Sequence, residues 1–141
     1  MNSAEQMYAV GLNDIVDTLM DTGTDVTYLI QGHMGTGKSE LLKMLTKKLG
    51  ATHLGCYFDC TTKDLGDITI PNIAKMDDGT GYVTYLTNEE LGMHIKKPIV
   101  LMLDEYGKAN KAVKNSLLRV ILEGKIGSYE LHPDSIVFAT T

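Results

Sequence analysis

Residues 32–39 read Gly32-His33-Met34-Gly35-Thr36-Gly37-Lys38-Ser39. This run satisfies the phosphate-binding loop pattern G-x-x-x-x-G-K-[ST] at every fixed position. The residues before it, 26–30, are apolar and mostly β-branched or aromatic, which predicts a buried strand. The residues after it, 40–49, carry leucines at helical spacing, which predicts an amphipathic helix. A strand, a glycine loop and a helix in this order form the context that the motif requires.

Each residue type in the loop has a chemical reason. Glycines allow backbone angles and a close approach that a Cβ would obstruct. The loop N–H groups and the helix N-terminus then converge on one anion site. Lys38 is expected to reach the β- and γ-phosphates, and the Ser39 hydroxyl to ligate Mg²⁺. We therefore predict a nucleoside triphosphate site formed by Gly32, His33, Met34, Gly35, Thr36, Gly37, Lys38, Ser39 and Glu40. The alternative is a glycine-rich turn with Lys38 on the surface.

A second motif lies at residues 99–105. Residues 99–103 are continuously apolar, as in a strand that is covered on both faces, and they end in Asp104-Glu105. Ligands of open α/β sheets bind beyond the carboxyl ends of the strands. We predict that Asp104 holds Mg²⁺ together with Ser39, and that Glu105 and Lys38 are catalytic, with Glu105 activating the attacking water. The alternative is a strand that ends in a solvated acidic turn.

Composition limits the remaining possibilities. A chain of 141 residues is long enough for one domain. The net charge of −5 argues weakly against a broad nucleic-acid-binding face. The polar start and the lack of an apolar run of membrane length favour a cytoplasmic protein without a membrane partner. Cys56 and Cys60 would share one face of a strand, so we expect two reduced, packed thiols rather than metal ligands.

The other elements are predicted from periodicity and from breakers such as glycine and proline. In the first part of the chain, we expect a helix over 12–20 ended by Gly23 and a strand over 54–59. A short helix and an inserted loop over 61–86 follow, with a strand or hairpin arm at 81–86, and then a short helix over 89–95 capped by Thr87 or Asn88. The last part should contain a helix over 111–122 ended by Gly124, a tight hairpin around 127–128, and a strand over 135–141.

Taken together, the chain resembles an AAA+ ATPase, and within that group the MoxR-type branch. The segments that carry the resemblance are GHMGTGKS at 32–39, CTTKDLGD at 60–67, IVLMLDEYGKA at 99–109, NSLLRVILEGKIG at 115–127 and IVFATT at 136–141. The resemblance implies the three-layer α/β sandwich of P-loop NTPases with a mainly parallel sheet, in which 1–25 form a helix and lead-in and 26–141 form one nucleotide-binding core. It also implies ATP and Mg²⁺ as ligands and self-association into a ring, hexameric for the full-length protein. The segment 61–86 would face the ring pore and contact a protein client.

The sequence departs from the family pattern in three places. Members often carry Asn two residues after the catalytic Glu, where this chain has Gly107. The polar sensor residue would come just after Thr141, and the arginine finger and helical lid would come later still. Arg119, the only arginine, lies in the middle of a predicted helix and is not assigned the finger role. We therefore expect the N-terminal part of a longer ATPase, with slow hydrolysis by this part alone, because the loss of an arginine finger costs about 10³–10⁵ in rate.

Four functions fit these features. The leading prediction is a motor ATPase that remodels a protein client. A DNA-directed helicase or loader of the same fold is an alternative, since a ring can contact DNA through a few lysines. A small-molecule kinase needs several cations around the transferred phosphate, which a chain with one arginine supplies poorly. A nucleotide switch without catalysis is the fourth.

Overall fold

The central element is a four-stranded parallel sheet. The computed structural model describes residues 3–32 and 38–141. The strands lie in the order β1 (Tyr28–Ile30), β8 (Ile136–Thr140), β5 (Ile99–Asp104) and β2 (Leu54–Asp59), and each neighbouring pair is parallel. This arrangement confirms the predicted α/β fold with a mainly parallel sheet.

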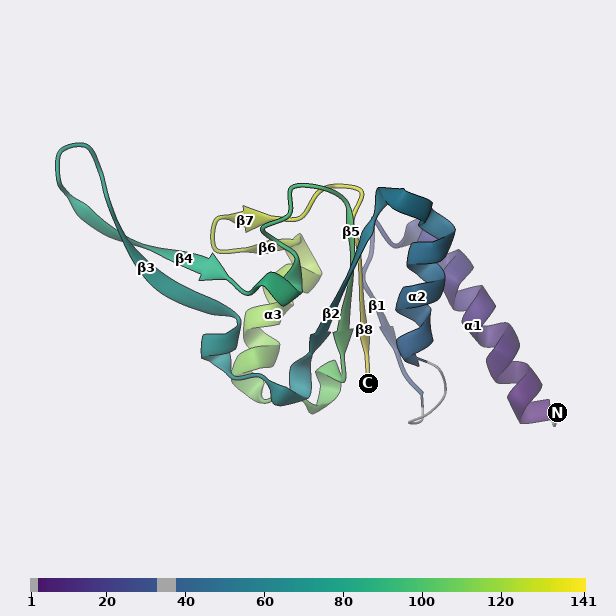
Figure 1. Cartoon of the computed structure of the whole chain (residues 1–141). Coiled ribbons are helices and arrows are strands. Elements are labelled where there is room, and N and C mark those ends of the chain that lie inside the picture. The colour runs from purple at the N-terminus through teal and green to yellow at the C-terminus, as the bar shows by residue number, and fades with distance from the viewer. Residues whose placement is uncertain (1–2, 33–37) are drawn as a thin grey trace.

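Helices cover both faces of this sheet (Figure 1). The helices α1 (Ser3–Thr22) and α2 (Lys38–Leu49) lie on one side, here called the α2 face, and α3 (Lys111–Glu123) lies on the other, here called the α3 face. Alternate residues of β5 point to opposite faces. Met102 belongs to the core cluster of the α2 face, whereas Leu101 and Leu103 belong to that of the α3 face. Burial on both sides explains why β5 is apolar throughout and confirms the three-layer sandwich.

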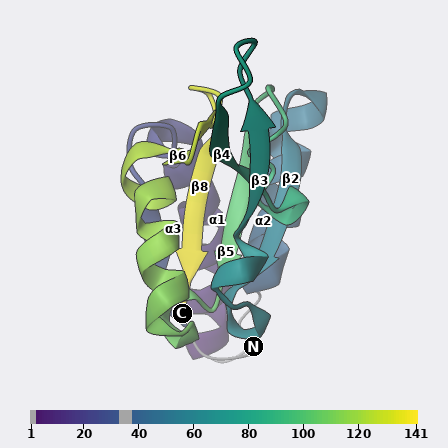
Figure 2. The ribbon, with the colours of Figure 1, turned by 90° about the vertical axis from the view of Figure 1, so that its left-hand side faces the viewer.

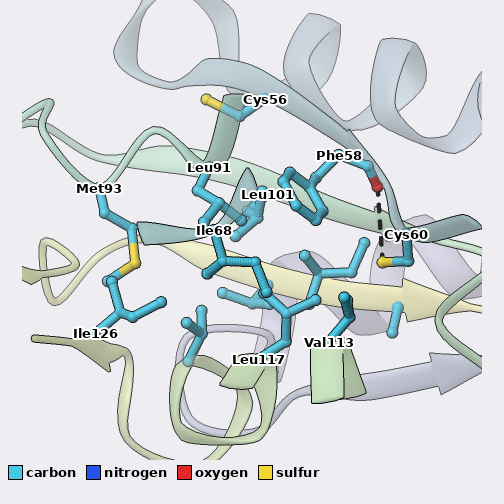
Figure 3. Packing of buried hydrophobic residues seen from close by; sticks show 14 of the residues in the cluster. Cys56, Phe58, Cys60, Ile68, Leu91, Met93, Leu101, Val113, Leu117 and Ile126 are labelled. Carbon is cyan, nitrogen blue, oxygen red and sulfur yellow. Dashed lines mark hydrogen bonds between the residues drawn. The ribbon is translucent and has the colours of Figure 1, made fainter. Parts of the chain in front are cut away.

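The two cysteines are part of the core on the α3 face (Figure 3). Cys56 and Cys60 are free thiols, and both are buried beside Phe58. Burial raises the pKa of Cys56, and burial followed by the nearby Asp59 charge raises the pKa of Cys60 to about 12. Both groups are therefore neutral thiols at neutral pH. The structure confirms the prediction of packed thiols.

The connection from β2 to β5 differs from the prediction. Two 3₁₀ turns, η2 (Cys60–Thr62) and η3 (Leu65–Asp67), lead into an antiparallel hairpin of β3 (Thr69–Lys75) and β4 (Gly81–Thr87). Two 3₁₀ turns thus replace the expected short helix, and β3 lies where a loop was expected, whereas the hairpin arm at 81–86 is confirmed. The hairpin extends away from the body of the molecule (Figures 1 and 2). Because apolar side chains are exposed on both of its faces, the alternation that identifies a half-buried strand is missing from its sequence.

Several element boundaries also differ from prediction. The first helix begins at Ser3, well before residue 12, and β1 has three residues rather than five. The helix expected over 89–95 is a single 3₁₀ turn, η4 (Glu89–Leu91), capped by Asn88. Gly92 ends it at φ 69°, where an added Cβ would lie 2.5 Å from the Cys56 sulfur. Close packing against β2 therefore stops this turn.

The last third of the chain matches the prediction more closely. Asn110 caps α3, which ends at Gly124 in a left-handed conformation. The small hairpin of β6 (Lys125–Ile126) and β7 (Tyr129–Glu130) follows, as predicted around 127–128. Two further 3₁₀ turns complete the elements, η1 (Gly50–Thr52) and η5 (Tyr106–Lys108). Within the described residues, the helices lack the combination of length and apolar character that a membrane span requires.

Candidate active site

The residues with predicted chemical roles meet at the carboxyl end of the sheet. Parallel pairing brings the ends of β5 and β8 to one side, and α2 begins on that same side (Figure 1). Asp104 is the last residue of β5, Thr140 is the last residue of β8, and Lys38 is the first residue of α2. This is the edge at which ligands of open α/β sheets bind.

The Lys38 ammonium group lies at the centre of this edge. Its Nζ donates to the carbonyl oxygens of Gly32 (3.1 Å) and Thr141 (2.8 Å) and to Oε1 of Glu105 (3.4 Å). The side chain is only 10% exposed. The structure therefore brings together the predicted phosphate-binding cation and the predicted catalytic carboxylate, 67 positions apart in the sequence.

Glu105 adopts an unusual backbone conformation. Among the described residues it is the one non-glycine at positive φ, with φ 54°. Such conformations cost about 1–3 kcal/mol and persist where the surrounding contacts enforce them, often at functional sites. The Glu105 N–H donates to Thr140 Oγ1 (3.0 Å), and Oε2 lies 3.4 Å from Lys108 Nζ, an ion pair without hydrogen-bond geometry. The carboxylate thus lies between two lysines.

Both oxygens of the Asp104 carboxylate accept hydrogen bonds from hydroxyl groups. The Tyr57 hydroxyl donates to Oδ2, and Thr140 Oγ1 donates to Oδ1 (2.7 Å). The hydrogen bond to Asp104, followed by burial, raises the pKa of Tyr57, so its hydroxyl keeps its proton at neutral pH. Thr140 is fully buried and also accepts the Glu105 N–H. One threonine hydroxyl therefore connects the two acidic residues.

The remaining predicted residues have different outcomes. Ser39 follows Lys38 in the first turn of α2 and is an exposed residue. Glu40 is also in this turn, but its side chain is exposed and pairs with Lys43 at 3.7 Å. His33, Met34, Gly35, Thr36 and Gly37 lie outside the described residues, so their nucleotide-binding roles stay predictions.

Two residues of the site were missed from the sequence, Tyr57 and Thr140. Thr140 had a readable signal, because it is the polar end of an apolar strand, as Asp104 is in β5. Tyr57 had none, because its contact with Asp104 depends on the register of β2 against β5, in which Asp59 is the residue opposite Asp104. A register of this kind is not visible in one sequence.

The donor atoms at this edge fit magnesium. The Ser39 hydroxyl and the Asp104 carboxylate are hard oxygen ligands, and two protein ligands suffice for Mg²⁺, which retains waters and takes phosphate oxygens. In the described part of the chain, His, Cys, Asp and Glu form no group of three or more that could hold a metal. The Lys38 ammonium is held by oxygen atoms that phosphate oxygens can replace. The residues present therefore fit a magnesium nucleotide.

A hollow of about 490 Å³ lies elsewhere in the molecule. It is lined by 23–27, 120–124 and 130–133, at the amino ends of β1 and β8. Its charged lining residues include Asp25, Glu123 and Glu130. Carboxylates repel phosphate, so this hollow is a poor nucleotide site despite its size.

Comparison with known protein families agrees with this geometry. Residues 27–134 match the family model of the AAA domain (dynein-related subfamily). The chain belongs to this family. The matched segment contains the phosphate loop, β5 with Asp104 and Glu105, and α3. Membership in the AAA family supports nucleotide binding and ATPase activity. Curated protein sequences gave no match to this AAA domain.

Proposed function

We propose that this AAA domain binds and hydrolyses Mg·ATP to drive a MoxR-type remodelling ATPase that acts on a protein client. The observation that carries the proposal is the convergence of the Lys38 ammonium with the adjacent carboxylates of Asp104 and Glu105 at one sheet edge. A cation for the phosphates, a carboxylate for the metal and a second carboxylate for water are the parts that ATP hydrolysis needs.

The contacts within the site indicate how it would respond to ATP. Lys38 is the predicted partner of the β- and γ-phosphates. Nucleotide binding would therefore draw its ammonium group away from Glu105. Glu105 would then lose one of its two cationic neighbours and could accept a proton from water, as general-base catalysis requires. Ser39 and Asp104 would hold Mg²⁺, which neutralises charge on the phosphates when it is bound.

The β3–β4 hairpin is the proposed client-binding surface. Its exposed apolar side chains include Ile73, which is 78% exposed, and further residues on both faces, namely Ile70, Met76, Tyr82, Val83, Tyr85 and Leu86. A two-stranded hairpin gains little stability by itself, and apolar side chains exposed in this number mark interaction surfaces. Its strands carry one charged residue, Lys75, and its turn carries Asp77 and Asp78. This composition favours a protein client over DNA.

Steady-state turnover of Mg·ATP tests the proposed hydrolysis. Rates should be measured at several protein concentrations for the unmodified chain, for Glu105→Gln and for a control, Glu123→Gln. The control removes an exposed carboxylate of α3 that pairs with Arg119, away from the site. We expect Glu105→Gln to lower turnover by about 10²–10⁴, the usual contribution of a positioned base, and the control to leave it unchanged.

The concentration series tests the ring. A rate that rises more than linearly with protein concentration indicates sites that are completed by a neighbouring subunit. Equal turnover in Glu105→Gln and the unmodified chain would contradict the role of Glu105. Tight Mg·ATP binding without turnover in either chain would contradict hydrolysis by this chain alone and would leave nucleotide binding as its supported activity.

A further inference from the structure

Tyr57 occupies a position in the fold that points its side chain toward the proposed metal site. It lies in β2, opposite Met102 of β5 in the parallel register. Its neighbours Cys56 and Phe58 belong to the core on the α3 face, so the alternation of the strand directs Tyr57 to the α2 face. On that same face, two residues earlier, a Cβ added to Gly55 would lie 3.0 Å from Thr46 of α2. Tyr57 lies two residues beyond Gly55 on this face, closer to the carboxyl end of the sheet, where α2 begins.

The Asp104 carboxylate is held from both sides of its strand. In the sheet order, β5 lies between β8 and β2. Thr140 donates to one oxygen from β8, and Tyr57 donates to the other oxygen from β2. Each carboxylate oxygen has two acceptor sites, so each keeps one for a metal ion or a metal-bound water. The two hydroxyls therefore orient the carboxylate without blocking it.

The two hydroxyls differ in their surroundings. Thr140 is fully buried, whereas Tyr57 is 44% exposed. An aromatic ring so exposed contributes little to the core. The hydrogen bond of its hydroxyl to Asp104 is therefore the contact that distinguishes tyrosine from phenylalanine at this position.

We propose that Tyr57 is a positioning residue that orients the Asp104 carboxylate for the magnesium ion of the bound nucleotide. This inference rests on the proposed function, because it requires Mg·nucleotide at this edge. Residues that hold a metal-binding carboxylate from behind typically contribute about 10–100-fold to metal affinity or activity. A purely structural hydroxyl that ties β2 to β5 would affect stability and leave metal dependence unchanged.

The test compares the unmodified chain with Tyr57→Phe, which removes the hydroxyl and keeps the ring. Tyr28→Phe is the matched control, because Tyr28 is also in the sheet and its hydroxyl bonds Thr22 at 2.6 Å, at the opposite end of β1 from the site. Calorimetry would measure ADP binding in EDTA and at a series of Mg²⁺ concentrations, and thermal unfolding would be recorded for each variant.

We expect the three chains to bind ADP equally in EDTA. In Tyr57→Phe, the Mg²⁺ concentration for half-maximal strengthening of ADP binding should rise by about 10–100-fold, while Tyr28→Phe should match the unmodified chain. Unchanged Mg²⁺ dependence in Tyr57→Phe would overturn the inference, and a lowered unfolding temperature with that result would identify a structural tie. If the unmodified chain bound no ADP in EDTA or with Mg²⁺, both the proposed function and the role of Tyr57 would be contradicted.

Discussion

At the scale of single residues, the acidic groups of the site are held by lysines and by hydroxyl groups. Lys38 and Lys108 flank the Glu105 carboxylate, and two hydroxyls hold Asp104. Charge-assisted hydrogen bonds of this kind are stronger than neutral ones and fix geometry. These contacts therefore fix the positions of the two acidic residues, and the main rearrangement expected on ATP binding is the transfer of Lys38 from Glu105 to phosphate oxygens.

Gly107 shows why this chain departs from the Asn that related ATPases often have. Its φ is not in the left-handed region, so conformation does not demand glycine here. Limited space favours glycine instead, because a Cβ added at residue 107 would clash with Thr141 Oγ1 and would lie 3.2 Å from Thr141 Cβ. Thr141 in turn donates its N–H to Ile30 and accepts from Lys38 through its carbonyl oxygen. A larger residue at 107 would therefore disturb a contact of Lys38.

We expect Gly107→Ala to destabilise the fold by about 1–3 kcal/mol, the usual cost of overpacking. The measurement is chemical unfolding of Gly107→Ala, Thr141→Ala and the double variant. Removal of the Thr141 hydroxyl frees space. Gly107→Ala should therefore lower the free energy of unfolding less in the Thr141→Ala background than in the unmodified chain. If the two costs simply add, the contact between these residues is not the reason for glycine.

The residue scale also separates what a sequence can reveal from what it cannot. Lys38, Asp104 and Glu105 were predictable because short motifs specify them. The structure brings Lys38 into contact with Glu105, the residue that follows Asp104 in the chain. Tyr57 was not predictable, because its role depends on which residues of β2 and β5 lie side by side, and this register depends on packing of the whole sheet.

At the scale of elements, the strands that are buried on both faces were the easiest to predict. The apolar run of β5 and the limits of β2 follow from composition and flanking breakers. The hairpin strand β3 was missed because Pro71 and Asn72 are unfavourable in strands and because solvent reaches both faces of the hairpin. Its regular pairing with β4 over seven residues comes from the antiparallel ladder rather than from an apolar pattern.

The hairpin should contribute little to the stability of the domain. We expect the double variant Ile73→Thr, Val83→Thr to change the free energy of unfolding by less than about 1 kcal/mol, since both side chains are exposed cross-strand partners. Leu101→Ala, in the fully buried core, should cost about 2–5 kcal/mol. Urea unfolding of both variants would check this. A hairpin variant as destabilised as Leu101→Ala would mean that these apolar residues stabilise the fold and need no client.

At the scale of the whole molecule, the proposed nucleotide site and the proposed client surface are separate. The site lies at the carboxyl end of the sheet, and the tip of the hairpin extends toward the other end (Figures 1 and 2). The hairpin connects through η3 and η2 to the end of β2, the strand that supplies Tyr57. A change at the site therefore has a short covalent path to the base of the hairpin.

ATP is expected to bind at the edge of the sheet where Lys38 contacts Glu105 and where β5 ends in Asp104. The most direct measurement is calorimetric titration of Mg·ATP into the unmodified chain, Lys38→Ala and Lys43→Ala, the last being a control because Lys43 is an exposed lysine of the same helix. We predict that Lys38→Ala weakens binding by about 10–100-fold, as expected for lost hydrogen bonds to a charged group, and that Lys43→Ala binds like the unmodified chain. Equal binding by Lys38→Ala, or no binding by the unmodified chain, would contradict nucleotide binding at this edge.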